Sequence, residues 1–250
     1  MRLPVEILNR IFSFLVSDLS TLTTCSKDPL LFPIVERHLY YHVHVHFDGR
    51  TDNLGTFGPD DLSNRISENP RIVHYVRILH LEFNSISTQT KVLLEFATTL
   101  RMFSLLESIW LTGTDVFFQF PDAFRAAFED RLGQPTIKEL RLDGRTTIPV
   151  SWLNRVKNLE DLFLSGSFDV TGRSSSTLPQ LKSLSMNLTS NSFPAGFAWI
   201  DLHTNTVQSL RLSNLGPLFQ LRCLQAQTLN ILDICLHKSQ CKSPDLFRWS

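Results

Sequence analysis

The feature that most constrains this chain is an aliphatic triplet, L-x-x-L-x-L, that recurs along residues 76–234. Its last three positions alternate apolar and other residues, as in a strand with one buried face. The copies stand at Val76/Leu79/Leu81, Leu106/Ile109/Leu111, Ile137/Leu140/Leu142, Leu159/Leu162/Leu164, Leu181/Leu184/Met186, Val207/Leu210/Leu212 and Leu229/Leu232/Ile234. Because their starts are 30, 31, 22, 22, 26 and 22 residues apart, the spacing predicts stacked parallel strands, one per repeat.

The residues between the triplets predict how these strands are connected. Residues 91–103 and 121–132 have helical patterns, and Gly133 is expected to end the second helix as its C-cap. Gly113, Gly144 and Gly166 each fall seven residues after a repeat start, which predicts a shared turn just past the strand. The expected fold class is therefore α/β, with parallel strands separated by helices or irregular turns.

The first 47 residues carry a different pattern, typical of three short helices. Pro4 suits a first helical position, and apolar residues then recur at spacings of one, three and four as far as Leu15. Asp18 is expected to cap a second helix, and a third is expected from residue 33 to about residue 39. So small a bundle cannot bury all of these side chains. They either cap the following domain or contact a partner.

Three blocks within residues 3 to 43 resemble, in this order, an F-box: L-P-V-E-I-L-N-R-I-F-S-F-L, D-L-S-T-L-T-T-C-S-K and P-I-V-E-R-H-L-Y-Y-H-V. The later pair Asn69-Pro70 is similar to the junction of fungal F-box proteins with leucine-rich repeats. The resemblance implies an F-box-like helical module at 1–47, a linker and junction at 48–70, and a leucine-rich-repeat-like solenoid at 71–250. Residues 27–33 depart from the family's pattern because two prolines interrupt them.

The resemblance also implies a partner, a Skp-family adaptor that links such modules to a cullin–RING ubiquitin ligase. The implied role is substrate-recognition adaptor of an SCF-type ligase. The positions that match motif residues packing the module or docking the adaptor are Leu3, Pro4, Ile7, Leu8, Ile11, Phe12, Leu15 and Leu19.

One residue in each triplet is predicted to point outward, on the concave face, between the last two aliphatic positions. That row contains His80, Trp110, Arg141, Phe163, Ser185, Arg211 and Asp233. Aromatic residues and arginines dominate protein–protein hot spots. We therefore expect a protein target, of unknown identity, to bind at Trp110, Arg141, Phe163 and Arg211. The alternative is that loops cover the two aromatic side chains.

Residues 39–47 alternate strictly, which predicts a strand with His42, His44 and His46 on one face. Residues 48–64, rich in Gly, Asp, Asn and Thr, predict a polar loop. Asp48 completes no known metal motif with the histidines, so the favoured interpretation is solvent-facing histidines on an edge strand. Cys235, His237 and Cys241, with Cys223, match no standard zinc spacing. No metal or other cofactor is expected.

Other function classes are disfavoured by composition. Lys+Arg and Asp+Glu are 24 each, which argues against a nucleic-acid partner. No apolar run has the roughly 18 residues of a membrane span, and no signal peptide opens the chain. Four sparse cysteines favour the cytoplasm or nucleus. No phosphate loop, G-x-S-x-G or H-E-x-x-H occurs, so no enzyme is expected. The alternatives are a repeat scaffold without a ligase role and a metal-dependent enzyme using the histidines at 42–46.

Overall fold

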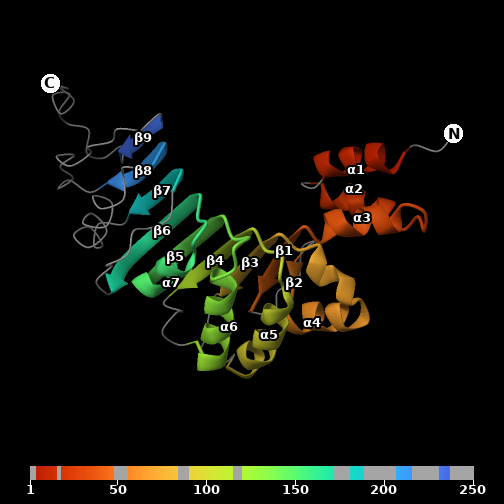
Figure 1. The fold of residues 1–250 in the computed structure, drawn as a ribbon, viewed down its shortest axis with the longest axis horizontal. Coiled ribbons are helices and arrows are strands. Elements are labelled where there is room, and N and C mark those ends of the chain that lie inside the picture. The colour runs from red at the N-terminus through yellow and green to blue at the C-terminus, as the bar shows by residue number, and fades with distance from the viewer. Residues whose placement is uncertain are drawn as a thin grey trace.

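The computed structural model describes residues 4–15, 18–47, 56–83, 90–114, 120–171, 181–188, 207–215 and 231–236. In this part of the chain, three N-terminal helices precede an all-parallel sheet that alternates with helices (Figure 1). The expected α/β class is confirmed. No helix among these residues is long and apolar enough to cross a membrane.

The three N-terminal helices form where the sequence predicts them. They are α1 (Val5–Phe14), α2 (Leu19–Cys25) and α3 (Phe32–Leu39). The Asp18 carboxylate accepts the backbone N–H of Thr21 at 3.1 Å, which satisfies a donor that would otherwise lack a partner at the start of α2. Phe12, Leu22 and Val35 are almost fully buried and form a small core between the helices. The bundle therefore has an interior of its own.

The strands follow in the order β2-β1-β3-β4-β5-β6-β7-β8-β9, and each neighbouring pair is parallel. Their bounds are β1 (His42–His46), β2 (Thr56–Phe57), β3 (Ile78–Phe83), β4 (Ser108–Thr114), β5 (Glu139–Pro149), β6 (Asp161–Thr171), β7 (Ser183–Leu188), β8 (Ser209–Leu215) and β9 (Ile231–Leu236). Every predicted triplet lies in register with the next: Leu79 opposite Ile109, Ile109 opposite Leu140, and so on to Leu210 opposite Leu232. The predicted repeat strands are confirmed.

Two expectations about residues 39–64 need correction. The strand β1 forms as predicted, but β2 flanks it on one side and β3 on the other, so it is not an edge strand. Val43 and Val45 pair with Leu79 and Leu81, which makes β1 a repeat strand as well. Residues 59–64, expected in a loop, belong to helix α4 (Pro59–Glu68). The sequence did not predict this helix, because most of its residues are polar and only Leu62 and Ile66 supply buried aliphatic side chains.

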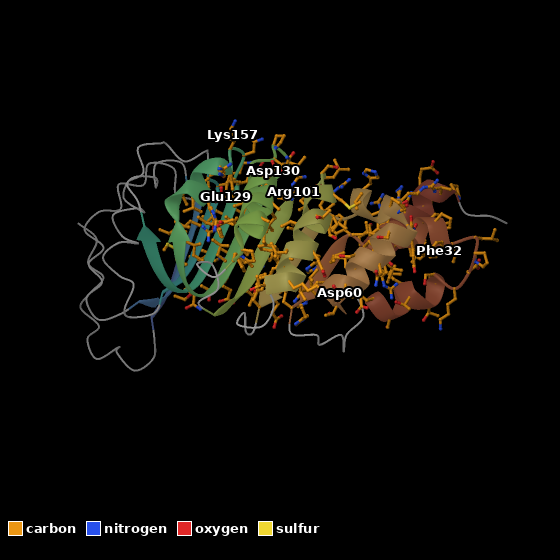
Figure 2. The ribbon with its side chains drawn as sticks, turned by 90° about the horizontal axis from the view of Figure 1, so that it is seen from below. Phe32, Asp60, Arg101, Glu129, Asp130 and Lys157 are labelled. Carbon is orange, nitrogen blue, oxygen red and sulfur yellow. The ribbon has the colours of Figure 1, made fainter. Side chains whose placement is uncertain are left out.

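The helices cover one face of the sheet (Figure 1). They are α4, α5 (Thr90–Met102), α6 (Asp122–Leu132) and the short α7 (Val150–Arg155), with a 3₁₀ turn at Pro70–His74. The two helices predicted at 91–103 and 121–132 are confirmed. Beneath them the aliphatic rows of the strands are buried together with Phe47, Phe83, Phe96 and Phe124. Charged side chains such as Asp60, Arg101 and Asp130 lie on the outer side of this helical layer (Figure 2).

The three recurring glycines lie within strands and not in a turn beyond them. Gly113 pairs with Gly144, and Gly144 with Gly166, so they form one row across β4, β5 and β6. All have positive φ, at 154°, 147° and 118°, a conformation that favours glycine. A Cβ on Gly144 would lie 1.6 Å from the carbonyl oxygen of Gly113. The row therefore allows a closer approach of the backbones than any side chain permits.

A partly buried hydrogen bond joins the N-terminal helices to the sheet domain. Asn69 Nδ2 donates to Glu36 Oε1, and the Asn69 side-chain oxygen accepts the backbone N–H of Arg71. Glu36, on α3, is 6% exposed. Its burial raises the pKa of the carboxyl group, an effect that the hydrogen bond from Asn69 partly opposes. The single amide of Asn69 thus caps the 3₁₀ turn and pairs a buried acid on α3.

Asn69→Ala is expected to lower the free energy of unfolding by about 1–3 kcal/mol, because the Glu36 carboxylate loses its amide donor. A raised pKa means that the contribution of Glu36 is fully present below the unfolded pKa and is lost as the pH rises through the folded pKa. Glu36→Gln keeps the acceptor and removes this loss, so at pH 7 it should be as stable as the parent or more so. Urea unfolding at pH 7 and pH 4.5 checks both variants. Equal stability of parent and Asn69→Ala would contradict the assignment.

Candidate functional site

An apolar stripe on α1 remains exposed to solvent. Ile7, Ile11 and Phe14 are spaced by four and three residues, so they share one side of the helix. Their exposed fractions are 47%, 43% and 75%. Pro4, one turn earlier, is exposed as well. We call these four residues the α1 stripe.

The α1 stripe is separate from the side of the helix that packs the bundle. Phe12 is buried in the bundle core, and Leu8, Leu15 and Leu19 are partly buried against it. Of the eight positions matched to the F-box motif, Pro4, Ile7 and Ile11 are exposed, and Leu8, Phe12, Leu15 and Leu19 pack within the bundle. Leu3 lies outside the described residues. The sequence pattern did not identify Phe14, whose exposure depends on how α1 is rotated against α3.

The bundle does not bury the α1 stripe on the sheet domain. The cluster around Phe12 is distinct from the large core of the sheet. The helices α1–α3 lie at one end of the molecule, next to β1 and α4 (Figure 1). Two further exposed apolar side chains, Leu30 and Phe32, lie at the start of α3. Among the described residues, the N-terminal bundle thus presents its apolar surface to solvent.

A second surface is the sheet face opposite the helices, which we call the open face. The residues between the last two aliphatic positions of the triplets pair across neighbouring strands, as predicted. The row now includes β1 and reads His44, His80, Trp110, Arg141, Phe163, Ser185, Arg211 and Asp233. Arg141 and Arg211 are exposed, and Trp110 and Phe163 are half-buried.

Among the four predicted target-binding residues, Arg141 lies against both Trp110 and Phe163. The Arg141 guanidinium lies over the Trp110 ring, 4.2 Å from its centroid, and 6.0 Å from the centroid of Phe163. Arg141 Nε also donates to Glu139 Oε1. Arg211 is separated from this group by the strand that carries Ser185. The aromatic–cation stack of Trp110, Arg141 and Phe163 is the centre of the open face.

Glu139 holds this stack in place, a role that the sequence did not reveal. Trp110 Nε1 donates to Ser108 Oγ at 2.6 Å, and Ser108 Oγ donates to Glu139 Oε2 at 2.7 Å. Burial alone would raise the pKa of Glu139, but the hydrogen bonds from Ser108 and Arg141 outweigh it and lower this pKa. Glu139 is therefore a carboxylate at neutral pH. It fixes Trp110 and Arg141 from one side.

Histidines occupy the β1 end of the open face. The rings of His44 and His80 stack with their centroids 3.9 Å apart, and His42 meets Trp110 edge-on at 4.9 Å. Burial lowers the pKa of His80 to about 3, with the neighbouring histidines acting in the same direction. Burial also lowers the pKa of His42 and of His44. These imidazoles are uncharged at neutral pH.

A carboxylate from the neighbouring strand β3 completes the histidine group. Glu82 lies opposite His46 in the β1–β3 register. Its Oε2 is 3.0 Å from His44 Nε2 and 3.3 Å from His46 Nε2. The sequence could have suggested this only if β1 had been aligned with β3. The side chains of the cysteine and histidine pattern at 223–241 lie outside the described residues.

The charge of the open face is unbalanced. Among the described side chains of its rows are four carboxylates, on Glu82, Glu139, Asp143 and Asp161, against the two guanidinium groups of Arg141 and Arg211. Burial and the nearby Glu139 raise the pKa of Asp161. His42, His44 and His80, whose pKa values are lowered, add no compensating charge at neutral pH. The face is therefore mildly acidic around an aromatic–cation centre.

A scan against protein-family models found no match, and neither did searches of curated proteins and of solved structures.

Proposed function

We propose that this chain is the substrate-recognition adaptor of an SCF-type cullin–RING ubiquitin ligase. In this proposal residues 1–47 are an F-box-like module that docks a Skp-family adaptor, and the repeats are a leucine-rich-repeat-like solenoid that holds a target protein. The observation that carries the proposal is the α1 stripe. A three-helix bundle with its own core still exposes Ile7, Ile11 and Phe14.

An exposed stripe favours docking over the alternative that these helices only cap the repeats. A cap would bury its apolar side against the core that it closes, because that burial is what stabilises it. Here the apolar side chains of α1 that are buried or partly buried pack within the bundle. The face that remains suits a partner, since apolar surface of this kind on a soluble protein marks an interaction site. The F-box resemblance of the same residues identifies that partner as the Skp-family adaptor.

The open face is the proposed site for the target. Trp110, Arg141 and Phe163 are residue types that dominate hot spots, and the hydrogen bonds of Glu139 hold two of them in place. The excess of carboxylates around them favours a target segment with positive charge. The chain itself transfers nothing in this proposal. It raises the effective concentration of target lysines near a ubiquitin-charged enzyme of the ligase.

The direct test measures the affinity of the purified chain for a purified Skp-family adaptor by calorimetry. The parent should bind, and the double variant Ile7→Glu, Ile11→Glu should lose at least about 100-fold in affinity, because two charges enter an apolar interface. Leu94→Glu is the matched control. Leu94 is a 45% exposed apolar residue on α5, away from the α1 stripe.

Circular dichroism establishes that each variant is folded before binding is measured. Equal affinity of the parent and the double variant would reject the α1 stripe as the docking surface. No binding by a folded parent would reject the ligase role altogether and leave a repeat scaffold. Loss of binding in Leu94→Glu as well would show that a charge anywhere on the surface suffices, which the proposal excludes.

A further inference from the structure

Two strands bring three ligand side chains together at the β1 end of the open face. His44 and His46 are two residues apart on β1, so both point to the same side of the sheet. Glu82 stands opposite His46 on β3. On the other side of the sheet, Val43, Val45 and Leu81 are fully buried, which fixes the register of the two strands. The fold thus fixes the positions of the three residues. The side chains of His44, His46 and Glu82 are 24%, 15% and 23% exposed.

The two separations from the Glu82 oxygen to the histidine nitrogens are close to those between ligand atoms around a tetrahedral metal ion. Zinc–nitrogen and zinc–oxygen bonds of about 2.0–2.1 Å place neighbouring tetrahedral ligand atoms about 3.3 Å apart. Glu82 Oε2 lies 3.0 Å from His44 Nε2 and 3.3 Å from His46 Nε2. All three residues offer ligand atoms within 4.8 Å of one another. An ion could therefore be held between these three side chains, in place of the contacts now made to Glu82.

Neighbouring side chains orient the ligands. The His44 ring lies between two others: His80 stacks on it with an interplanar angle of 5°, and His46 lies 4.0 Å away between centroids. His80 is itself anchored, since its Nε2 forms a 2.8 Å hydrogen bond with Thr112 Oγ1. Such outer contacts set the ring orientation of a ligating histidine and contribute to metal affinity. The ligand set is consequently organised before any ion arrives.

We propose that His44, His46 and Glu82 bind one divalent ion of the Zn²⁺ type. Two imidazoles and one carboxylate are a set that zinc accepts, and they leave a fourth position open on the solvent side. Water would fill that position in the free protein. Because the site lies in the same face as Trp110 and Arg141, a side chain of a bound protein could replace the water. The site stands on the geometry of β1 and β3 alone and does not depend on the proposed ligase role.

The test uses the full chain, stripped of metal with a chelator and kept reduced. Zn²⁺ binding is measured by calorimetry, and Co²⁺ binding by visible absorbance, whose d–d bands report four-coordination. The parent should bind one equivalent at this site, and Glu82→Gln and His44→Ala should each lower the affinity by at least about 100-fold. His74→Ala, which removes an exposed histidine far from the site, should change nothing.

Two results would overturn the proposal. One is Zn²⁺ affinity that Glu82→Gln and His44→Ala leave unchanged. The other is a Co²⁺ complex with thiolate-to-metal charge-transfer bands, which would place the ion on cysteines instead. Glu82→Gln preserves the shape of the side chain, so its fold is expected to survive and circular dichroism confirms this. Adaptor binding by the α1 stripe is measured separately, so either proposal can fail while the other stands.

Discussion

Gly144→Ala is expected to destabilise the sheet domain by about 3 kcal/mol or more. The Cβ that it adds would lie 1.6 Å from the carbonyl oxygen of Gly113 and 2.8 Å from its carbonyl carbon. These are backbone atoms, so no change of rotamer relieves the overlap. A φ of 147° is also a conformation that alanine rarely adopts. The strands β4 and β5 must separate locally, which breaks their hydrogen bonds.

Gly133→Ala is the matched control for this variant. Gly133 ends α6 with a φ of −73°, in the right-handed region, so its role as C-cap needs no glycine. A Cβ there would meet only Asp130 O and Glu129 O, at ordinary distances of 3.5 and 3.6 Å. Stability should therefore be unchanged or higher by up to about 1 kcal/mol. Urea unfolding followed by circular dichroism measures both, and a Gly144→Ala protein as stable as the parent would refute the close approach.

Phe83→Ala is expected to lower the free energy of unfolding by about 3–5 kcal/mol, the usual cost of deleting a large core side chain. Phe83 is fully buried at the end of β3. Its ring stacks on Phe47 with centroids 4.3 Å apart and packs against Phe120 and Phe124 at 5.1 and 6.2 Å. Phe47 directly follows β1, Phe124 belongs to α6, and Phe120 lies just before α6. The cavity would therefore loosen the attachment of β1 and α6 together.

Phe14→Ala removes the same side chain from a surface position. Phe14 is 75% exposed on the α1 stripe, so its loss should change stability by no more than about 0.5 kcal/mol. Its expected effect is instead weaker adaptor binding. The pair of variants separates folding from docking. A large stability loss in Phe14→Ala, or one below about 1 kcal/mol in Phe83→Ala, would contradict the burial that the structure assigns.

The parts of the fold that follow from local pattern could be predicted from the sequence. The triplets fixed seven strands and their mutual register, because one buried face demands an aliphatic residue at every second position. The helices of the N-terminal bundle followed from Pro4, Asp18 and a 3.6-residue period. α4 did not, because its sequence PDDLSNRISE is polar and its few apolar side chains act only against the sheet core. β1 was recognised as a strand but not as a repeat, since its repeat opens at Tyr40, an aromatic residue, and the next triplet does not start until Val76.

The candidate site, like the fold, has parts that could be predicted from the sequence and parts that could not. The row from His80 to Arg211 followed from strand alternation, and the structure places the Arg141 guanidinium against both Trp110 and Phe163. The role of Glu139 and the meeting of Glu82 with His44 and His46 depend on which strands are neighbours, so they became visible only with the sheet order. The sequence predicted that the three glycines share one position, but it placed them in a turn past the strands and not within the strands. The residues around a glycine do not indicate that its φ is positive inside a strand. Arg211 was correctly placed on the face, yet it stands apart from the aromatic–cation stack.

The measurement that tests the central claim most directly is assembly with a complete ligase core. The purified chain is mixed with a Skp-family adaptor bound to cullin and RING subunits, and the mixture is analysed by size-exclusion chromatography with light scattering. The account predicts a single complex whose mass increases by one copy of this chain, and no such complex with the Ile7→Glu, Ile11→Glu variant. A folded parent chain that elutes alone, beside an unchanged ligase core, would contradict it.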